Sequence, residues 1–230
     1  DRFPDDTPRG TSEFRNVLAE LPGATADWIV LGAHYDTKAG IVPFEGANDS
    51  GSGVGVLIEL ARILRATPPA RRPSVRLAFF DGEECRVSYG PRDGLHGSRR
   101  LAVQLRAEVQ RAPVRAVIIV DMVGDRDLNL TIPRNGTPAL MRALFAAAEA
   151  EGLRHRIRLG AGSILDDHVP FLERGFPAVD LIDFEYGSAP GLNDYWHTPA
   201  DTLDKLSAES LAVTGRIIRR YLALQTPPPE

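Results

Sequence analysis

The sequence predicts an α/β fold: a single-domain, three-layer αβα sandwich around a mixed, mainly parallel central sheet. Continuous apolar runs of strand length alternate with stretches in which apolar residues recur at helical spacing. Runs that are apolar throughout are typical of strands buried on both faces of a parallel sheet. The chain has 230 residues, which suits one α/β domain, and no repeat or linker divides it.

The apolar runs predict four buried strands, separated from helices by polar and Pro-Gly segments. The strands are expected at 28–33, 75–80, 114–120 and 176–182, with an edge strand at 16–21. The helices are expected at 52–65, 98–110, 138–151, 169–174 and 207–224. The two ends are expected to be an irregular arm at 1–12 and a Pro-rich tail at 225–230. We therefore expect residues 1–230 to form one catalytic domain.

The composition argues against several classes of protein. With 43% hydrophobic and 25% charged residues the chain is an ordinary globular one, and its net charge of -4 gives no reason to expect a nucleic-acid partner. No apolar run approaches the roughly 20 residues of a membrane span. The single cysteine, Cys85, excludes an internal disulfide and a cysteine cage for a metal.

Potential metal ligands stand at the C-terminal ends of three predicted strands. In chain order they are His34 and Asp36, then Asp81, Glu83 and Glu84, and finally Asp121. Ligands of parallel sheets bind beyond these strand ends. Because neighbouring carboxylates repel, a fold that gathers them must supply a cation or raise a pKa, and both are features of sites of chemistry. For the Asp81–Glu84 segment alone, a solvated acidic turn is the alternative.

A catalytic zinc ion takes about three protein ligands and keeps one position open for water or substrate. The candidate ligands are His34, Asp49, Glu84, Asp121 and His197. Their spread along the chain suits a site assembled from strand ends rather than from one helix. Asp49 also precedes a predicted helix, where a carboxylate satisfies free N–H groups, so a capping role alone would explain it.

The adjacent residues Glu83 and Glu84 pose a geometric problem. Neighbouring side chains of an extended chain point to opposite sides, so both reach one site only if the chain turns, which Gly82 permits. One carboxylate would then bind a metal while the other carries a proton, which requires two different environments.

Taken together and in order, these motifs resemble those of the M28 family of zinc exopeptidases. The resemblance covers about 16–222 and is carried by His34-x-Asp36, Gly46-Ala-Asn-Asp49-Ser-Gly-Ser-Gly53, Asp81-Gly-Glu-Glu84, Asp121 and Trp196-His197-Thr198. Within the family the sequence looks more like the glutaminyl-peptide cyclotransferases (glutaminyl cyclases). Their longer segment with an aromatic residue after Glu-Glu is similar to 85–96, which contains Tyr89. His34-Tyr-Asp-Thr-Lys38 and Asp166-Asp-His-Val-Pro-Phe171 are also similar to their motifs.

The resemblance implies a role for each residue of the catalytic centre. Asp49, Glu84 and His197 would hold a single zinc ion. Glu83 would be the general acid/base, with Asp121 hydrogen-bonded nearby.

The resemblance also implies the substrate-binding residues. Asp166 would bind the substrate amine or the leaving amide, and Trp196 and Tyr89 would form walls of the pocket. Two positions depart from the animal cyclases: Leu165 stands in place of Gln, and Asp180 in place of His.

The activity that the resemblance implies is conversion of an N-terminal glutamine to pyroglutamate with release of ammonia. The alternative is a two-zinc aminopeptidase, in which His34 and Asp121 bind the second ion and Asp49 bridges both. In cyclases, the histidine at the place of His34 is not a zinc ligand. An inactive binding module is a third possibility, which the intact Glu83-Glu84 pair disfavours. By resemblance, we expect a monomeric, periplasmic or secreted protein that acts on the N-termini of peptides or proteins.

Three further histidines are not expected to bind a metal. His168 lies on one face of a short predicted helix and is interpreted as a structural histidine with satisfied hydrogen bonds. His96 and His155 stand among arginines and glycines and are expected at the surface.

Overall fold

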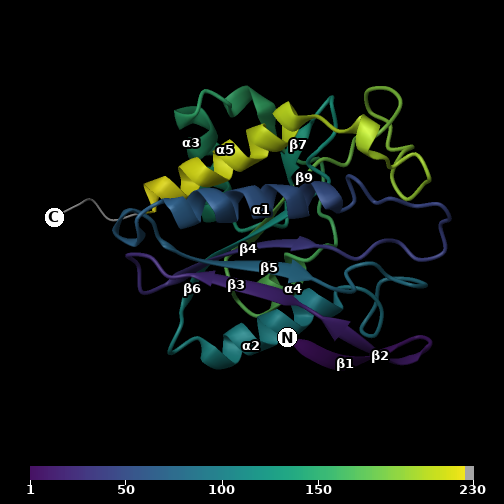
Figure 1. Ribbon diagram of the computed structural model, residues 1–230, viewed down its shortest axis with the longest axis horizontal. Helices are drawn as coiled ribbons and strands as arrows, with labels where there is room; N and C mark the ends of the chain where they lie inside the picture. Colours follow the sequence, from purple (N-terminus) through teal and green to yellow (C-terminus); the bar gives the residue numbers. More distant parts are fainter. Residues whose placement is uncertain (226–230) are drawn as a thin grey trace.

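The computed structural model describes residues 1–225, apart from the side chain of Arg71 (Figure 1). The strands are β1 (Arg2–Thr7), β2 (Gly10–Arg15), β3 (Val17–Leu21), β4 (Trp28–His34), β5 (Ser74–Phe80), β6 (Val114–Asp121), β7 (Leu130–Ile132), β8 (Ile157–Leu159) and β9 (Ala178–Ile182). The helices are α1 (Gly51–Ala66), α2 (His96–Glu108), α3 (Pro138–Ala150), α4 (Val169–Glu173) and α5 (Ala208–Leu224). All but the first residue of the predicted Pro-rich tail lies outside the described residues.

Seven strands form one mixed sheet in the order β3-β5-β4-β6-β9-β7-β8. The four central strands, β5, β4, β6 and β9, run parallel. At one edge β3 is antiparallel to β5, and toward the other edge β7 is antiparallel to β9. The prediction of a mixed, mainly parallel sheet is confirmed.

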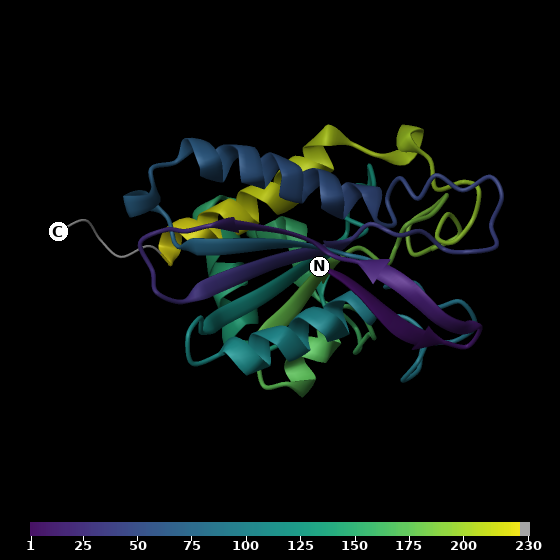
Figure 2. The same ribbon diagram turned by 60° about the horizontal axis from the view of Figure 1, so that its bottom comes forward.

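Helices cover both faces of this sheet, as Figures 1 and 2 show. The core that contains residues of α1, α3 and α5 lies on one face, and the core that contains residues of α2 lies on the other. Because successive side chains of a strand point to opposite faces, Ile29 and Leu31 enter the first core and Val30 enters the second. This double burial accounts for the unbroken apolar runs and confirms the three-layer prediction.

Local chemistry sets the beginnings of two helices. The Ser207 side chain accepts hydrogen bonds from the backbone N–H groups of Glu209 and Ser210, which begins α5. Pro138 is the first residue of α3, where its missing N–H would have had no helical partner.

The prediction that residues 1–12 form an irregular arm is wrong. β1 and β2 form an antiparallel pair in which the buried Phe3 faces Phe14. Phe14 stacks on His96 with the ring centroids 4.2 Å apart, and His96 Nδ1 lies 2.7 Å from Asp5 Oδ2. His96 is therefore buried and not at the surface. The prolines in this segment had indicated a loop, but a strand with a free edge tolerates them, as Pro4 does in β1.

The sequence also does not predict β7 and β8. Each strand has only three residues, too few to show a period of two. Together they extend the sheet beyond β9.

The face of the sheet on which the connecting helices lie changes at β4. α1 connects β4 to β5 on one face, whereas α2 connects β5 to β6 on the opposite face, and β4 lies between β5 and β6. Such a switch point leaves room for a ligand beyond the carboxyl ends of the strands. The long loops that follow these strands gather at this end, to the right in Figures 1 and 2.

Candidate active site

Five segments far apart in the sequence supply the potential metal ligands. The end of β4 contributes His34, the loop before α1 contributes Asp49, and the end of β6 contributes Asp121. Glu84 follows β5, and His197 lies in the connection from β9 to α5. The first four are buried and His197 is half-buried.

Asp49, Glu84 and His197 converge on one point. His197 Nε2 lies 2.9 Å from Glu84 Oε1 and 3.1 Å from Asp49 Oδ2. A tetrahedral zinc ion with ligands at about 2.1 Å separates its donor atoms by about 3.4 Å, so small shifts of these side chains would enclose an ion. Despite its neighbour, the buried Asp49 Oδ2 accepts no hydrogen bond of good geometry and is available to a metal.

Charges in this group are balanced by the histidines. Burial opposes the charged form of His197, yet its close contact with the Asp49 carboxylate and its hydrogen bond to Glu84 raise its pKa to about 9. Burial likewise opposes the charge of Asp49, but the close contacts with the His197 and His34 imidazoles keep its pKa below the usual value. A divalent cation would take the place of the protons that the carboxylates draw onto these imidazoles.

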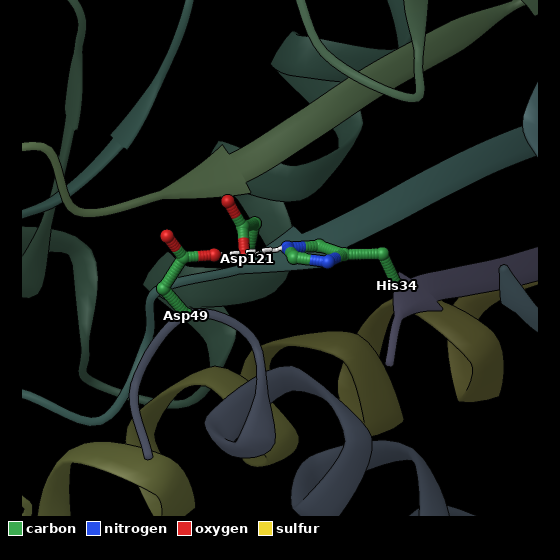
Figure 3. A group of neighbouring side chains, drawn as sticks. All are labelled: His34, Asp49 and Asp121. Atoms are coloured by element: carbon green, nitrogen blue, oxygen red, sulfur yellow. Dashed lines mark ion pairs between the residues drawn. The ribbon is translucent and has the colours of Figure 1, made fainter. Parts of the chain in front are cut away.

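His34, Asp49 and Asp121 form a second group, which shares Asp49 with the first (Figure 3). His34 Nε2 lies 3.1 Å from Asp49 Oδ1 and 3.3 Å from Asp121 Oδ1. Its other ring nitrogen, Nδ1, lies 3.1 Å from the backbone oxygen of Asp36. Asp49 thus stands between two sets of donor atoms, and each set has the composition of a metal site.

Glu83 and Glu84 both face the site because the chain turns after β5. Gly82 has a φ of +71°, in the left-handed region that favours glycine. The Asp36 carboxylate accepts the backbone N–H groups of Glu83 at 3.1 Å and Glu84 at 3.2 Å, which fixes the turn. The two side chains then meet different neighbours, since Lys38 Nζ lies 3.2 Å from Glu84 Oε2.

Glu83 lies in an environment that favours its protonated form. The Tyr89 hydroxyl donates to its carboxylate oxygens at 2.9 Å and 3.1 Å, and this contact alone would favour the charged form. Burial raises the pKa of Glu83 well above the ordinary value, despite the attraction of His34. Repulsion from Asp166 and Asp167 adds to this pKa shift. Glu83 is therefore suited to accept and release a proton.

A cavity of about 140 Å³ is lined by all the residues to which the resemblance to cyclases assigned a role in the catalytic centre or in substrate binding. These residues are Asp49, Glu83, Glu84, Tyr89, Asp121, Asp166, Trp196 and His197. Ile164, Leu165 and Phe184 complete the wall. The Trp196 ring stacks on His197 with centroids 3.9 Å apart and lies 5.1 Å from Phe184. Larger hollows exist elsewhere on the surface, but this one combines convergent metal-ligand atoms with aromatic walls.

A buried polar set beside the cavity was only partly anticipated. Asp167, His168 and Asp180 are fully buried, and donor atoms of Asp166, His168 and Asp180 lie within 4.8 Å of one another. Both ring nitrogens of His168 lack a hydrogen-bond partner among the described residues. The prediction that the hydrogen bonds of this histidine are satisfied is therefore wrong. Burial raises the pKa of Asp166 and Asp180 well above the usual value. It also raises the pKa of Asp167 to about 7 and lowers that of His168 to about 4. The signal available in the sequence was one aspartate, Asp180, inside an apolar strand.

Comparison with known proteins places this geometry in a family. The model of peptidase family M28 matches residues 16–222, which is most of the chain. This chain belongs to peptidase family M28. The glutaminyl-peptide cyclotransferase-like protein of Mus musculus is 31% identical over 97% of this chain and 63% of its own length. The chain thus spans slightly less than two thirds of that relative.

Solved structures of the M28 fold agree with the architecture described above. The structure of an Acidobacteriales bacterium glutaminyl cyclase has a TM-score of 0.91 and 39% sequence identity, and the match covers 98% of this chain and 78% of that one. A Zn-dependent exopeptidase from Parabacteroides distasonis has a TM-score of 0.80 and 25% identity, with 96% and 82% of the two chains covered. The predicted membership of the M28 family, with likeness to glutaminyl cyclases, is confirmed.

Membership of M28 and the Zn-dependent neighbour point to zinc as the metal. The residues present fit this ion. His197 offers an imidazole nitrogen, and Asp49 and Glu84 offer carboxylate oxygens. These are ligand types that zinc takes in proteins, and three protein ligands leave a fourth position open.

Proposed function

We propose that this chain is a zinc-dependent glutaminyl-peptide cyclotransferase, which converts an N-terminal glutamine to pyroglutamate and releases ammonia. The observation that carries the proposal is the match over 98% of the chain to a solved glutaminyl cyclase at 39% identity. The resemblance of the sequence to glutaminyl cyclases rests partly on an aromatic residue after Glu-Glu, and here Tyr89 hydrogen-bonds to Glu83 inside the cavity.

In this proposal Asp49, Glu84 and His197 hold one zinc ion. When bound, zinc supplies Lewis-acid polarisation of the carbonyl of the glutamine side-chain amide. The carboxylate–lysine contact between Glu84 and Lys38 orients the ligand from outside the donor set, as partners of metal ligands commonly do.

Glu83 carries the proton in the reaction. The α-amine attacks the side-chain amide carbon, a C–N bond forms, and Glu83 accepts the proton that the amine loses. Glu83 then delivers this proton to the departing NH₂ group, so that the C–N bond of the amide breaks and ammonia leaves. Burial raises its pKa above that of an ordinary carboxylate, which strengthens Glu83 as a base in the first half of this transfer and lets it hold the proton until the second.

The remaining residues of the cavity hold the substrate. We assign Asp166 to the substrate amine or the leaving amide, and Trp196 and Tyr89 to the walls around the glutaminyl side chain. Asp121 is assigned with Glu83 to the catalytic step. The ring closure is intramolecular, and a compact cavity would hold the amine close to the carbonyl carbon of its own side chain. Such positioning can reach effective molarities of about 10⁵ M or more.

A two-zinc aminopeptidase is the second candidate, and one observation favours it. The group of His34, Asp49 and Asp121 could bind another ion beside the first, with Asp49 as the bridge. Metal analysis after dialysis against zinc separates the two proposals. One zinc per chain supports the cyclase, and two support the aminopeptidase.

The decisive test uses glutaminyl and leucyl chromogenic peptides and measures both ammonia and free amine. Release of ammonia from the glutaminyl substrate, without cleavage of the leucyl substrate, is expected. Cleavage of the leucyl substrate would refute the cyclase proposal. Glu83→Gln should lower kcat by about 10²–10⁴-fold while zinc remains bound. The matched neighbour Glu84→Gln should lose zinc as well as activity.

We further propose a monomer whose residues 1–230 act as one catalytic domain on peptide or protein N-termini, in the periplasm or outside the cell. The continuous seven-stranded sheet, which runs through the chain from β3 to β9, supports the one-domain part of this proposal. Among residues 1–225, no helix combines the length and the hydropathy that a membrane span requires. Size-exclusion chromatography with light scattering tests the oligomeric state.

A further inference from the structure

Asp201 is a fully buried carboxylate that contacts the backbone of a proposed metal ligand. Its Oδ1 accepts the backbone N–H of Asn48 at 2.8 Å, and its Oδ2 accepts that of Asp49 at 3.1 Å. The Tyr186 hydroxyl donates a third hydrogen bond, at 2.9 Å, to Oδ1. Asp201 forms no ion pair within residues 1–225, so its hydrogen bonds come from these neutral donors. A buried carboxylate without a cation is costly unless it is fully hydrogen-bonded, which indicates a specific role.

The segment that carries Asp201 also carries a second proposed ligand. His197 and Asp201 belong to one run of turns, in which Thr198 N–H donates to Tyr195 O and Asp201 N–H donates to Thr198 O. His197 has a φ of +54°, a conformation that non-glycine residues rarely adopt. This one segment therefore presents His197 and at the same time holds the loop of Asp49.

Tyr186 connects Asp201, which holds the loop of Asp49, to the hydrophobic interior. Its side chain is fully buried and its ring packs edge-on against Tyr195, with the centroids 5.4 Å apart. The backbone N–H of Tyr195 in turn donates to Tyr186 O at 3.2 Å. The Tyr186 hydroxyl thus reaches Asp201 from a rigid support.

The same device occurs at the other carboxylate ligand. Asp36 accepts the backbone N–H groups of Glu83 and Glu84, as Asp201 accepts those of Asn48 and Asp49. Each proposed carboxylate ligand is therefore held through its own amide by a second carboxylate.

We propose that Asp201 is a positioning residue, which orients Asp49 for metal binding through the amides of residues 48 and 49. This inference rests on the proposed role of Asp49 as a zinc ligand. Partners of metal ligands that set their orientation typically change metal affinity by about 10–100-fold when they are replaced.

Asp201→Asn tests the inference with little change in size. An amide offers one acceptor oxygen and one NH₂ group, so one of the two backbone N–H groups would face a donor. We expect the dissociation constant for zinc, measured by competition with a chromophoric chelator, to rise by about 10–100-fold. Saturating zinc should restore most of the activity, since Glu83 and the cavity remain intact.

Asp183→Asn is the matched control. Asp183 is also fully buried and also accepts two backbone N–H groups, from Asn129 at 2.7 Å and Glu185 at 2.9 Å, but these belong to no proposed ligand. Its replacement should lower thermal stability in EDTA and leave the zinc dissociation constant unchanged. Asp201→Asn should differ from it in zinc affinity, which a merely structural carboxylate would not affect.

Three outcomes overturn the inference: an unchanged zinc dissociation constant in Asp201→Asn, an equal weakening in Asp183→Asn, or full zinc binding by Asp49→Ala. If Asp201→Asn does not fold, Tyr186→Phe replaces it, because this variant keeps the ring and the carboxylate and removes one donor. It should weaken zinc binding several-fold, and unchanged binding would refute the inference. None of these measurements depends on ammonia release, so failure of the cyclase proposal would be recognised separately.

Discussion

Replacement of His168 by leucine tests whether this histidine is buried in its neutral form. Burial lowers its pKa to about 4 from the ordinary 6.5, and neither ring nitrogen has a hydrogen-bond partner among the described residues. Between these two pKa values the unfolded chain binds a proton that the folded chain does not. Burial of the neutral imidazole therefore does not lower the free energy of unfolding above pH 6.5, and it lowers this free energy progressively as the pH falls toward 4. At 1.36 kcal/mol per pKa unit, the loss between pH 7.5 and pH 4.5 is about 2.5 kcal/mol.

Urea unfolding of the wild type and of His168→Leu at both pH values measures this loss. EDTA in all samples removes any contribution from bound metal, and titrating groups common to both chains cancel in the difference. We expect the free energy of unfolding of the variant, relative to wild type, to rise by about 2.5 kcal/mol on acidification. His155→Leu, at an exposed histidine, should show no such change. If acidification instead favours the wild type, the imidazole is charged and paired with Asp166 or Asp180, and the reasoning is wrong.

Three other substitutions test the proton carrier and the packing behind the site. Tyr89→Phe removes the hydroxyl that donates to Glu83, which disfavours the charged carboxylate. The acid limb of the kcat/KM profile should therefore move to higher pH by about one to two units, and an unmoved limb would contradict the assigned contact. Gly53→Ala should lower the free energy of unfolding by about 1–3 kcal/mol, since a methyl group there overlaps the carbonyl oxygen of Val120. Gly55→Ala has no atom within 4 Å of the added methyl group and should raise stability by up to about 1 kcal/mol. Thermal unfolding of the two alanine variants checks the contrast, and equal losses would contradict it.

The elements that could be predicted are those whose burial shows as a run of consecutive apolar residues. The β4 run from Trp28 to Ala33 is apolar throughout because its two faces meet two cores. By contrast, β1 and β2 depend on Phe3 and Phe14 packing beside His96, a contact between residues about 80 positions apart. No local pattern encodes such a contact.

The candidate site divides in the same way. Residues at strand ends could be found, because topology alone brings such ends to one edge of a parallel sheet. The roles of Asp36 and Asp201, which hold the proposed ligands through their backbone amides, could not be predicted. Asp201 lies 152 positions from the amide of Asp49 that it holds, and its isolated position after His197 carries no signal of burial.

The segment after Glu84 shows how the cavity and the proton carrier are joined. Asp93 accepts the backbone N–H groups of residues 86, 87 and 88 at 2.7–3.0 Å, which closes this segment into a compact loop. The N–H of Leu95 then donates to the backbone oxygen of Glu83 at 2.9 Å. The loop thus returns to Glu83, whose carboxylate accepts the hydrogen bond of Tyr89. The wall of the cavity and the proposed base are therefore one hydrogen-bonded unit. A shorter connection could keep Glu83 and Glu84 but not this wall, and the pocket would then open beyond a single side chain. In the proposed cyclase, the closed loop would confine the cavity to one glutaminyl side chain, whereas a shorter connection would leave it open to varied N-termini.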